Sequence, residues 1–237
     1  MSFRGSDSVL QCCIAYNKYG GFCVPTSSRH RTAAQKILSG DVYEPETIEF
    51  LASNNNGGDI VHAGAYFGDF LPALSRSLMS GAKVWAFEPN HENYRCALIT
   101  TYINDLQNVE LINAGLGERQ DSLVMVTSSA DGRALGGGSR ILKDGDEISS
   151  ERREEVQVVT LDETIPLDRT VSIIHLDVEG YEGEALSGSL ETIRRCLPII
   201  LLETLPENEW MTKNILCLGY RKNGVVHSNA IYYIKQR

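Results

Sequence analysis

The sequence predicts an α/β fold built on a doubly wound, mostly parallel sheet that ends in an antiparallel hairpin. From Asp59 onward, short and almost uniformly apolar runs alternate with helical segments, a pattern typical of a parallel sheet that helices cover on both faces. The last two apolar runs, 215–220 and 230–234, lie close together in the chain, as an antiparallel pair would. The chain has 237 residues, of which 42% are hydrophobic, which is enough for one domain with a sizeable core.

We expect residues 1–57 to form an N-terminal leader that precedes the main domain at 58–237. The leader shows weak periodicity, apart from a short helix at 45–51 that Pro45 and the acidic residue after it would start. A run of Ser, Asn and Gly at 53–58 then breaks the chain before the first strand.

The first half of the main domain predicts three strands and two helices. Asp69 can cap the first of these helices, and Ser80 with Gly81 ends it. In chain order we expect a strand at 59–63, a helix from 69 to about 79, a strand at 82–87, a helix at 90–102 and a strand at 108–113.

The second half begins with an added strand at 122–127 and an insertion loop at about 128–150. The loop is rich in Gly, Ser and charge, and loops of this length are often lids, although a merely disordered insertion is the alternative. After it we expect strands at 156–161, 171–176 and 198–203, a helix at 182–195 that breaks near Gly188, a helix at 207–213, and the closing pair of strands.

The chain carries 22 basic and 31 acidic residues, a net charge of −9. This balance argues against nucleic-acid binding, which needs a basic surface to neutralise phosphates, and against docking on an anionic membrane. No apolar run reaches the roughly 20 residues of a membrane span, and the polar first residues show no secretory signal.

The six cysteines include no CxxC pair, so we expect reduced thiols in a cytoplasmic protein, with a redox role for Cys12 and Cys13 as the alternative.

Parallel sheets bind ligands at the carboxyl ends of their strands, and the first such end carries a glycine turn. The turn reads His62-Ala63-Gly64-Ala65-Tyr66-Phe67-Gly68. A dinucleotide fingerprint needs GxGxxG to seat a pyrophosphate, whereas Tyr66 stands at the middle position here. The turn therefore suits a ligand without phosphate, although close packing of strand on helix would also explain its glycines.

Candidate ligand residues follow the next two strands as well. Glu88 lies 24 positions after Gly64, about where a doubly wound fold places an acidic residue on ribose hydroxyls. Its alternative role is that of a helix-capping or surface glutamate. Ala114 and Gly115, after the third strand, leave room for a flat base or form a plain turn.

Three carboxylates follow the strand at 171–176: Asp177, Glu179 and Glu182. One could orient an amine, one could accept a proton, and a pair could hold a divalent cation. Glu182 could instead stabilise a helix N-terminus, and His175, on the same face as Asp177, could be a core histidine. A ligand with a ribose, a base and an amino-acid end but no phosphate fits this set, and S-adenosylmethionine is such a ligand.

Taken in order, these segments resemble the FkbM-type methyltransferases. The resemblance runs from about Asp59 to Glu203 and includes the AFEP and DVEGxE motifs; it is carried by 59–64, 86–90, 108–114, 160–162, 175–180 and 197–203. It implies a class I methyltransferase fold with a Rossmann-like sheet of seven strands, S-adenosylmethionine as methyl donor, and usually a hydroxyl acceptor. It also implies that the turn with Ala63, Gly64, Ala65 and Gly68 holds the methionine portion, that Glu88 holds the ribose, and that Asp177 and Glu179 line the reaction centre.

Two residues depart from the family pattern. The first strand of the family usually ends in Asp, where this chain has His62, and the lost contact to the amino-acid end of the cofactor could come from Glu44 or Thr47. The family commonly has Lys where this chain has His175, which titrates nearer neutral pH and could be the general base. The expected cofactor-binding set is Glu44, Thr47, His62, Ala63, Gly64, Ala65, Tyr66, Phe67, Gly68, Glu88, Pro89, Asn90, Ala114, Gly115 and Asp177.

The leading function is therefore an S-adenosylmethionine-dependent O-methyltransferase that acts on a hydroxyl of a small natural product or sugar. Asp177, Glu179 and His175 are the candidate catalytic residues, and Ser139 and Arg140 of the insertion loop are the candidate substrate contacts. In a metal-assisted version, Asp177, Glu179 and Glu203 would hold Mg²⁺. The alternatives are a Rossmann-like enzyme dependent on NAD or a nucleotide sugar, and a non-catalytic scaffold; the leader is a candidate surface for a homo-oligomer.

Overall fold

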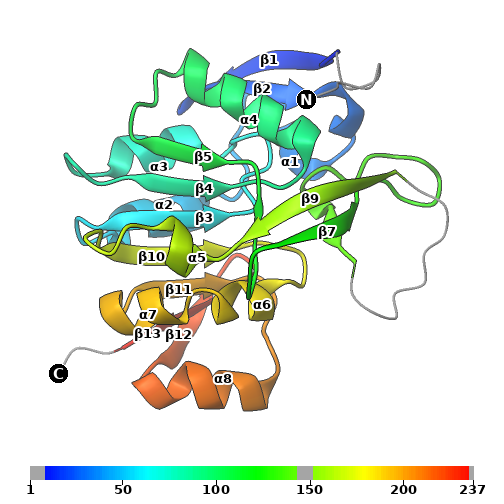
Figure 1. The fold of residues 1–237 in the computed structure, drawn as a ribbon. Helices are drawn as coiled ribbons and strands as arrows, with labels where there is room; N and C mark the ends of the chain where they lie inside the picture. Colours follow the sequence, from blue (N-terminus) through cyan, green and yellow to red (C-terminus); the bar gives the residue numbers. More distant parts are fainter. Residues whose placement is uncertain (1–8, 143–151, 235–237) are drawn as a thin grey trace.

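The computed structural model describes residues 9–142 and 152–234, and its centre is a mixed sheet of seven strands (Figure 1). Four neighbouring pairs are parallel, and β13 runs antiparallel to both of its neighbours. The predicted α/β class is confirmed, with a sheet that is mixed rather than uniformly parallel. From edge to edge the strands are β12 (Arg221–Val226), β13 (Asn229–Tyr233), β11 (Ile199–Leu202), β10 (Val171–Leu176), β3 (Asp59–Ala63), β4 (Val84–Phe87) and β5 (Val109–Ile112).

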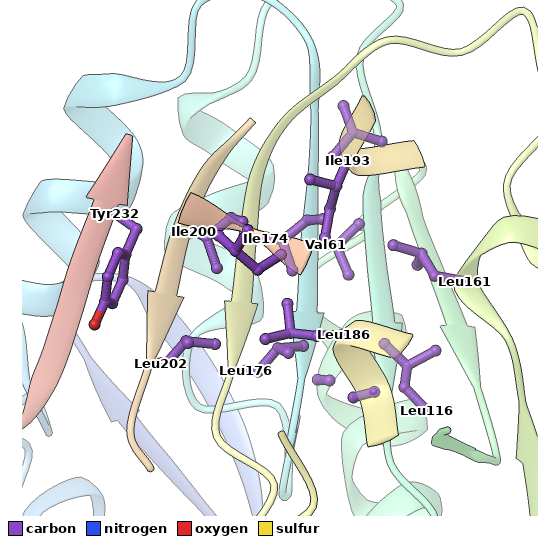
Figure 2. Packing of buried hydrophobic residues seen from close by; sticks show 14 of the residues in the cluster. Val61, Leu116, Leu161, Ile174, Leu176, Leu186, Ile193, Ile200, Leu202 and Tyr232 are labelled. Atoms are coloured by element: carbon purple, nitrogen blue, oxygen red, sulfur yellow. The ribbon is translucent and has the colours of Figure 1, made fainter. Parts of the chain in front are cut away.

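The sheet separates two hydrophobic layers because successive side chains of a strand point to opposite faces. Val61 and Ile174 belong to one layer, which Figure 2 shows packed against Leu161, Leu186 and Ile193. Those three residues lie on α5 (Leu161–Thr164), α6 (Glu182–Ser187) and α7 (Leu190–Cys196), and α8 (Asn208–Asn214) adds Met211. Ile60 belongs to the other layer, to which α2 (Pro45–Asn54) and α3 (Leu71–Ser77) contribute their apolar residues.

The segment before α2 contains more regular structure than its weak periodicity indicated. It forms a hairpin of β1 (Cys12–Asn17) and β2 (Gly20–Pro25), then η1 (Thr26–Ser28) and α1 (Thr32–Leu38). The hairpin packs on α4 (His91–Ile103), where the Cys23 amide donates to Thr100 Oγ1 at 2.9 Å. This long-range contact, rather than any local pattern, buries β2.

A second, four-stranded sheet stands beyond the carboxyl ends of β3, β4 and β5 (Figure 1). Its strand order is β6 (Gly115–Leu116), β9 (Arg153–Val159), β7 (Asp121–Val126) and β8 (Arg140–Ile141). The predicted insertion loop contributes η2 (Gly136–Gly138) and β8, so its first part is ordered, whereas 143–151 lies outside the described residues.

Two local predictions are wrong. Asp69 does not cap α3, because the helix begins at Leu71 with Phe70 as its N-cap and without a side-chain cap. The run 215–220 is not a strand: it forms η3 (Leu216–Leu218), and the closing strand β12 begins only at Arg221. The apolar residues of that run pack on the core, while β12 is an exposed edge strand that carries no apolar signature.

Among the described residues, no helix is long and apolar enough to cross a membrane. All six cysteines are free thiols.

Candidate active site

Two neighbouring cavities lie at the carboxyl ends of β3, β4 and β10, and they share Gly64, Gly137 and Asp177. We call the first the inner cavity; it is lined by Ala63, Gly64, Phe87, Glu88, Pro89, Gly115, Leu116, Met125, Gly137, Ser139, Ile141, Asp177, Val178 and Tyr181. We call the second the acidic cavity; it is lined by Arg31, Ala33, Tyr43, Glu44, His62, Gly64, Tyr66, Asp69, Phe70, Gly137, Gly138, Asp177, Glu179 and Glu203.

Gly64 lines both cavities, at a point where the turn after β3 passes very close to the residue that follows β10, Asp177. Its φ is +90°, and a Cβ at this position would lie 1.9 Å from the Asp177 carbonyl oxygen. The Gly64 amide donates to the Phe87 carbonyl at 3.0 Å, and the Asp177 amide donates to the Ala63 carbonyl at 3.1 Å. The turn is thus fixed to the strands on both sides, and only glycine fits.

Tyr66 occupies the position where the dinucleotide fingerprint has its middle glycine, yet it adopts the left-handed conformation, with φ of 49°. Its hydroxyl donates to Ser28 Oγ at 2.7 Å. Glu44 and Glu179 also have positive φ, at 46° and 53°. Three side chains of the acidic cavity are therefore held by backbone conformations that non-glycine residues rarely adopt, which is typical of functional sites.

Glu88 is almost completely buried at the end of β4, and its carboxylate is held by the backbone. Oε2 accepts a hydrogen bond from the Tyr66 amide at 2.7 Å, and Oε1 accepts one from the Asn90 amide at 2.8 Å. Burial raises the pKa of Glu88 to about 8, although both amides favour the charged form. The Asn93 side chain also hydrogen-bonds this carboxylate, and a carboxylate can accept about four hydrogen bonds, so an acceptor position remains for a ligand.

Residues 136–139 of the insertion loop close over the turn. Asn93 Nδ2 donates to the Gly136 carbonyl at 3.2 Å, and Asn90 Nδ2 donates to Ser139 Oγ at 3.3 Å. Gly137 lies against the Tyr66 ring, because a Cβ there would lie 3.3 Å from the nearest ring atom. The first part of the loop therefore forms a roof whose contacts come from the turn after β3, from α4 with its N-cap, and from the N-terminal segment.

The four-stranded sheet supplies an apolar wall to the inner cavity. Met125 of β7 and Ile141 of β8 form a small buried cluster, against which Tyr181 packs. They line the cavity together with Gly115 and Leu116 of β6. Such a surface suits a flat apolar group and offers few polar contacts.

Three carboxylates come together in the acidic cavity, with ligand atoms of Asp177, Glu179 and Glu203 within 4.8 Å of one another. Burial and the contact with Glu203 raise the pKa of Asp177 well above its ordinary value. Burial and Glu203 also raise the pKa of Glu179, against the effect of the Arg31 guanidinium. Asp69 is a further buried residue of the lining, and burial raises its pKa to about 7.

His62 and His175 form a buried pair behind the acidic cavity, with their Nδ1 atoms 3.0 Å apart. His175 Nε2 lies 3.2 Å from Asn229 Oδ1, so both of its ring nitrogens face protein groups. Burial lowers the pKa of both histidines, that of His175 to about 4, and each imidazole is neutral near pH 7. This placement suits a residue that positions its neighbours better than one that takes a proton from a substrate.

The structure brings most of the predicted residues to the two cavities. The predicted site residues that line them are Glu44, His62, Ala63, Gly64, Tyr66, Glu88, Pro89, Gly115, Ser139, Asp177, Glu179 and Glu203. The predicted residues that line neither cavity are Thr47, Ala65, Phe67, Gly68, Asn90, Ala114, Arg140 and His175. Of the latter, Arg140 is exposed and the others are buried or form part of the supporting structure.

Sequence reasoning missed Arg31, Tyr43, Met125 and Ile141. Arg31 and Tyr43 come from a segment without a clear pattern, and Met125 and Ile141 reach the cavity only through the pairing of β7 with β8. Val178 and Tyr181 also line the inner cavity. They lie inside the DVEGxE motif, and an apolar side chain next to the predicted carboxylates was the signal that could have identified them.

A model of the methyltransferase FkbM domain matches residues 62–221. No curated protein is similar enough in sequence to count as a match. Among solved structures, a methyltransferase FkbM from Methylobacillus flagellatus KT has a TM-score of 0.51 and 19% identity, over 75% of this chain and 43% of that one. A SAM-dependent methyltransferase from Aquifex aeolicus has a TM-score of 0.41 and 16% identity, over 81% and 88% of the two chains.

The match to the family model covers about two thirds of the chain, and the fold carries its site where an α/β sheet places one. The chain therefore belongs to the FkbM methyltransferase family. At 19% identity, the likeness to the Methylobacillus flagellatus protein is one of fold, and the present chain spans less than half the length of that protein.

Proposed function

We propose that the chain transfers a methyl group from S-adenosylmethionine to a hydroxyl of a small molecule, such as a sugar or another natural product. The observation that carries the proposal is the Glu88 carboxylate, which the amides of Tyr66 and Asn90 hold in place at the inner cavity. A ribose hydroxyl can donate to its remaining acceptor position. Met125 and Ile141 supply an apolar wall for a base.

The residues of this chain would divide the work between the two cavities. The inner cavity would hold the nucleoside, and the Gly64 turn would hold the amino-acid end near the acidic cavity. When bound, S-adenosylmethionine supplies a methyl group on a positively charged sulfur. Asp177 lines both cavities, which supports a place for it where an acceptor hydroxyl would meet that group.

Asp177 is the proposed proton acceptor. In its ionised form it would be a stronger base than an ordinary carboxylate, because burial and Glu203 raise its pKa. Glu203 would share the proton after the hydroxyl has lost it, and Glu179 would help to orient the acceptor. Ser139, in the roof of the inner cavity, would keep water out by closing over the nucleoside.

A version assisted by Mg²⁺ has one observation in its favour, the close approach of Asp177, Glu179 and Glu203. In that version the cation would lower the pKa of the acceptor hydroxyl. Methyl transfer measured after exhaustive chelation separates the two versions: undiminished turnover would exclude the metal.

Calorimetric titration with S-adenosylmethionine, S-adenosylhomocysteine and NAD⁺ tests the proposed function. We expect the first two to bind and NAD⁺ not to bind, and we expect Glu88→Ala to lower both affinities about tenfold or more, because hydrogen bonds to a charged group are lost. Circular dichroism of the variant checks that it folds. Affinity for NAD⁺ alone, or equal affinities in variant and wild type, would overturn the proposal.

A further inference from the structure

A chain of hydrogen bonds runs behind the acidic cavity and joins four residues from separate parts of the sequence. Glu44 at the start of α2 accepts from Asn229 Nδ2 of β13 at 3.5 Å. Asn229 Oδ1 lies 3.2 Å from His175 Nε2, and His175 Nδ1 lies 3.0 Å from His62 Nδ1. All four side chains are buried, so water does not compete for these contacts.

The proton positions along this chain follow from its first member. Glu44 accepts at Oε2 from both Thr47 Oγ1 and Asn229, which requires the Asn229 amide to turn its nitrogen toward Glu44 and its oxygen toward His175. His175 must then carry its proton on Nε2, where it donates to that oxygen, and its Nδ1 becomes an acceptor. The proton between the two Nδ1 atoms therefore belongs to His62.

This assignment leaves His62 Nε2 as a bare acceptor, and the structure gives that atom no hydrogen-bond partner among the described residues. His62 lines the acidic cavity and is only 2% exposed. A buried acceptor without a partner is costly, so a native structure normally supplies one. We propose that Glu44 acts through the two intervening side chains to hold His62 in the tautomer whose Nε2 binds a protonated amine in the acidic cavity.

The charges of the cavity favour an amine over a neutral donor. Five carboxyl side chains line it, namely those of Glu44, Asp69, Asp177, Glu179 and Glu203, and Arg31 is the cationic residue of the lining. His62 itself adds no positive charge near pH 7, because burial and the neighbouring His175 lower its pKa well below the ordinary value. The inference rests on the proposed function for the source of the amine, which is the amino-acid end of the cofactor.

The tautomer can be measured on the free protein by ¹⁵N spectroscopy of the imidazole rings. We expect a protonated Nδ1 and a bare Nε2 in His62, and the reverse in His175. Glu44→Ala should abolish this preference in both rings, while Glu44→Gln should keep it, because the glutamine oxygen still accepts from Asn229. Glu46→Ala removes an exposed glutamate of the same helix and is the matched control, which should match the wild type. The opposite assignment in the wild type would overturn the inference.

The ligand is tested with two nucleosides that differ only at the amino-acid end. S-adenosylhomocysteine carries the amine, and 5′-methylthioadenosine lacks it. We expect S-adenosylhomocysteine to shift the His62 Nε2 resonance and methylthioadenosine to leave it in place. His62→Phe should weaken S-adenosylhomocysteine binding about tenfold or more and leave methylthioadenosine binding within about twofold, since only the former loses a charged hydrogen bond.

The result also distinguishes the two proposals. If both nucleosides bind and His62→Phe weakens them equally, or if neither moves the His62 resonance, the nucleoside site stands and the role of His62 is overturned. If neither binds the wild type, the proposed function fails, and the amine contact fails with it. Because methylthioadenosine is measured on the same variant, a general loss of folding would lower both affinities and could not imitate the expected change in their ratio.

Discussion

His62 and His175 lie opposite each other in the register of β3 and β10, and their Nδ1 atoms are 3.0 Å apart with the two rings only 10° from parallel. This geometry places one proton on the line between two nitrogens. Charging His175 would put a second proton on that line, because its other ring nitrogen already donates to Asn229. The contact between the two Nδ1 atoms therefore depends on a neutral His175, and it is lost at low pH.

We predict that this pair makes the protein sensitive to acid. The pKa of His175 is about 4 in the folded chain and near its ordinary 6.5 in the unfolded chain, so the unfolded state binds more protons between these values. Stability from this group is present above pH 6.5 and is lost as the pH falls toward 4, by roughly 3 kcal/mol at most. Urea unfolding of wild type and His175→Gln across this range should show a smaller decrease in the variant. Parallel curves would contradict the prediction.

A pair of glycines separates the cost of a close contact from the cost of backbone strain. Gly64 and Gly81 have φ of +90° and +88°, but a Cβ would clash with the Asp177 carbonyl oxygen at Gly64 and would meet nothing within 4 Å at Gly81. We expect Gly81→Ala to cost about 1–2 kcal/mol of unfolding free energy, the cost of the left-handed conformation alone. Gly64→Ala should cost several kcal/mol more or prevent folding. Equal losses in thermal or urea unfolding would show that β3 and β10 can separate.

The main sheet could be predicted from the sequence because its strands carry their signal locally. The buried runs at 171–176 and 59–63 match β10 and β3, and the expected break near Gly188 falls between α6 and α7. The β1–β2 hairpin and β12 could not be predicted in this way. The short apolar run of β2 stands alone in the sequence and gains its burial from α1 and α4, whereas β12 is an edge strand with exposed side chains.

The site residues likewise differ in how far the sequence predicts them. Residues next to the strand ends, such as Gly64, Glu88 and Asp177, were predictable because a parallel sheet gathers its carboxyl ends at one edge. Arg31 and Met125 reach the cavities from other sheets and segments, which no periodicity reveals. The contact between His62 and His175 could not be predicted, because it depends on the register of β3 against β10. From the sequence, His175 was a candidate base; the structure instead surrounds it with protein groups.

We predict that cofactor affinity rises with pH because of Glu88. Burial raises the pKa of this carboxyl to about 8, and hydroxyl donors bind its charged form better. Affinity should therefore increase up to about pH 8 and level off above it, with a proton released on binding at pH 7. Glu88→Gln should bind more weakly and without this pH dependence. Calorimetry in buffers of different ionisation enthalpy measures the released proton, and equal release by the variant would contradict the assignment.

The same raised pKa predicts how the stability of the free protein changes with pH. The folded chain keeps a proton on Glu88 up to about pH 8, whereas the unfolded chain loses it near 4.5, so stability falls as the pH rises between these values. Glu182 and Asp69, each with a pKa raised to about 7 by burial, act in the same direction. The melting temperature of Glu88→Gln should decline less steeply than that of wild type over this range. An identical slope would indicate that the Glu88 carboxyl is charged throughout.

Asp177→Asn should separate chemistry from binding. The substitution keeps the size of the side chain and its place between the two cavities, but an amide cannot accept a proton from a hydroxyl. Loss of a general base costs about 10² to 10⁴ in rate, so we expect turnover to fall at least a hundredfold. S-adenosylhomocysteine affinity should change by less than about threefold, since Glu88 and the Gly64 turn remain.

Turnover is measured as transfer of labelled methyl from S-adenosylmethionine to a panel of hydroxylated small molecules, and affinity is measured by calorimetry. Turnover within about threefold of wild type would remove Asp177 from the mechanism, whereas parallel losses of turnover and affinity would assign it to cofactor binding.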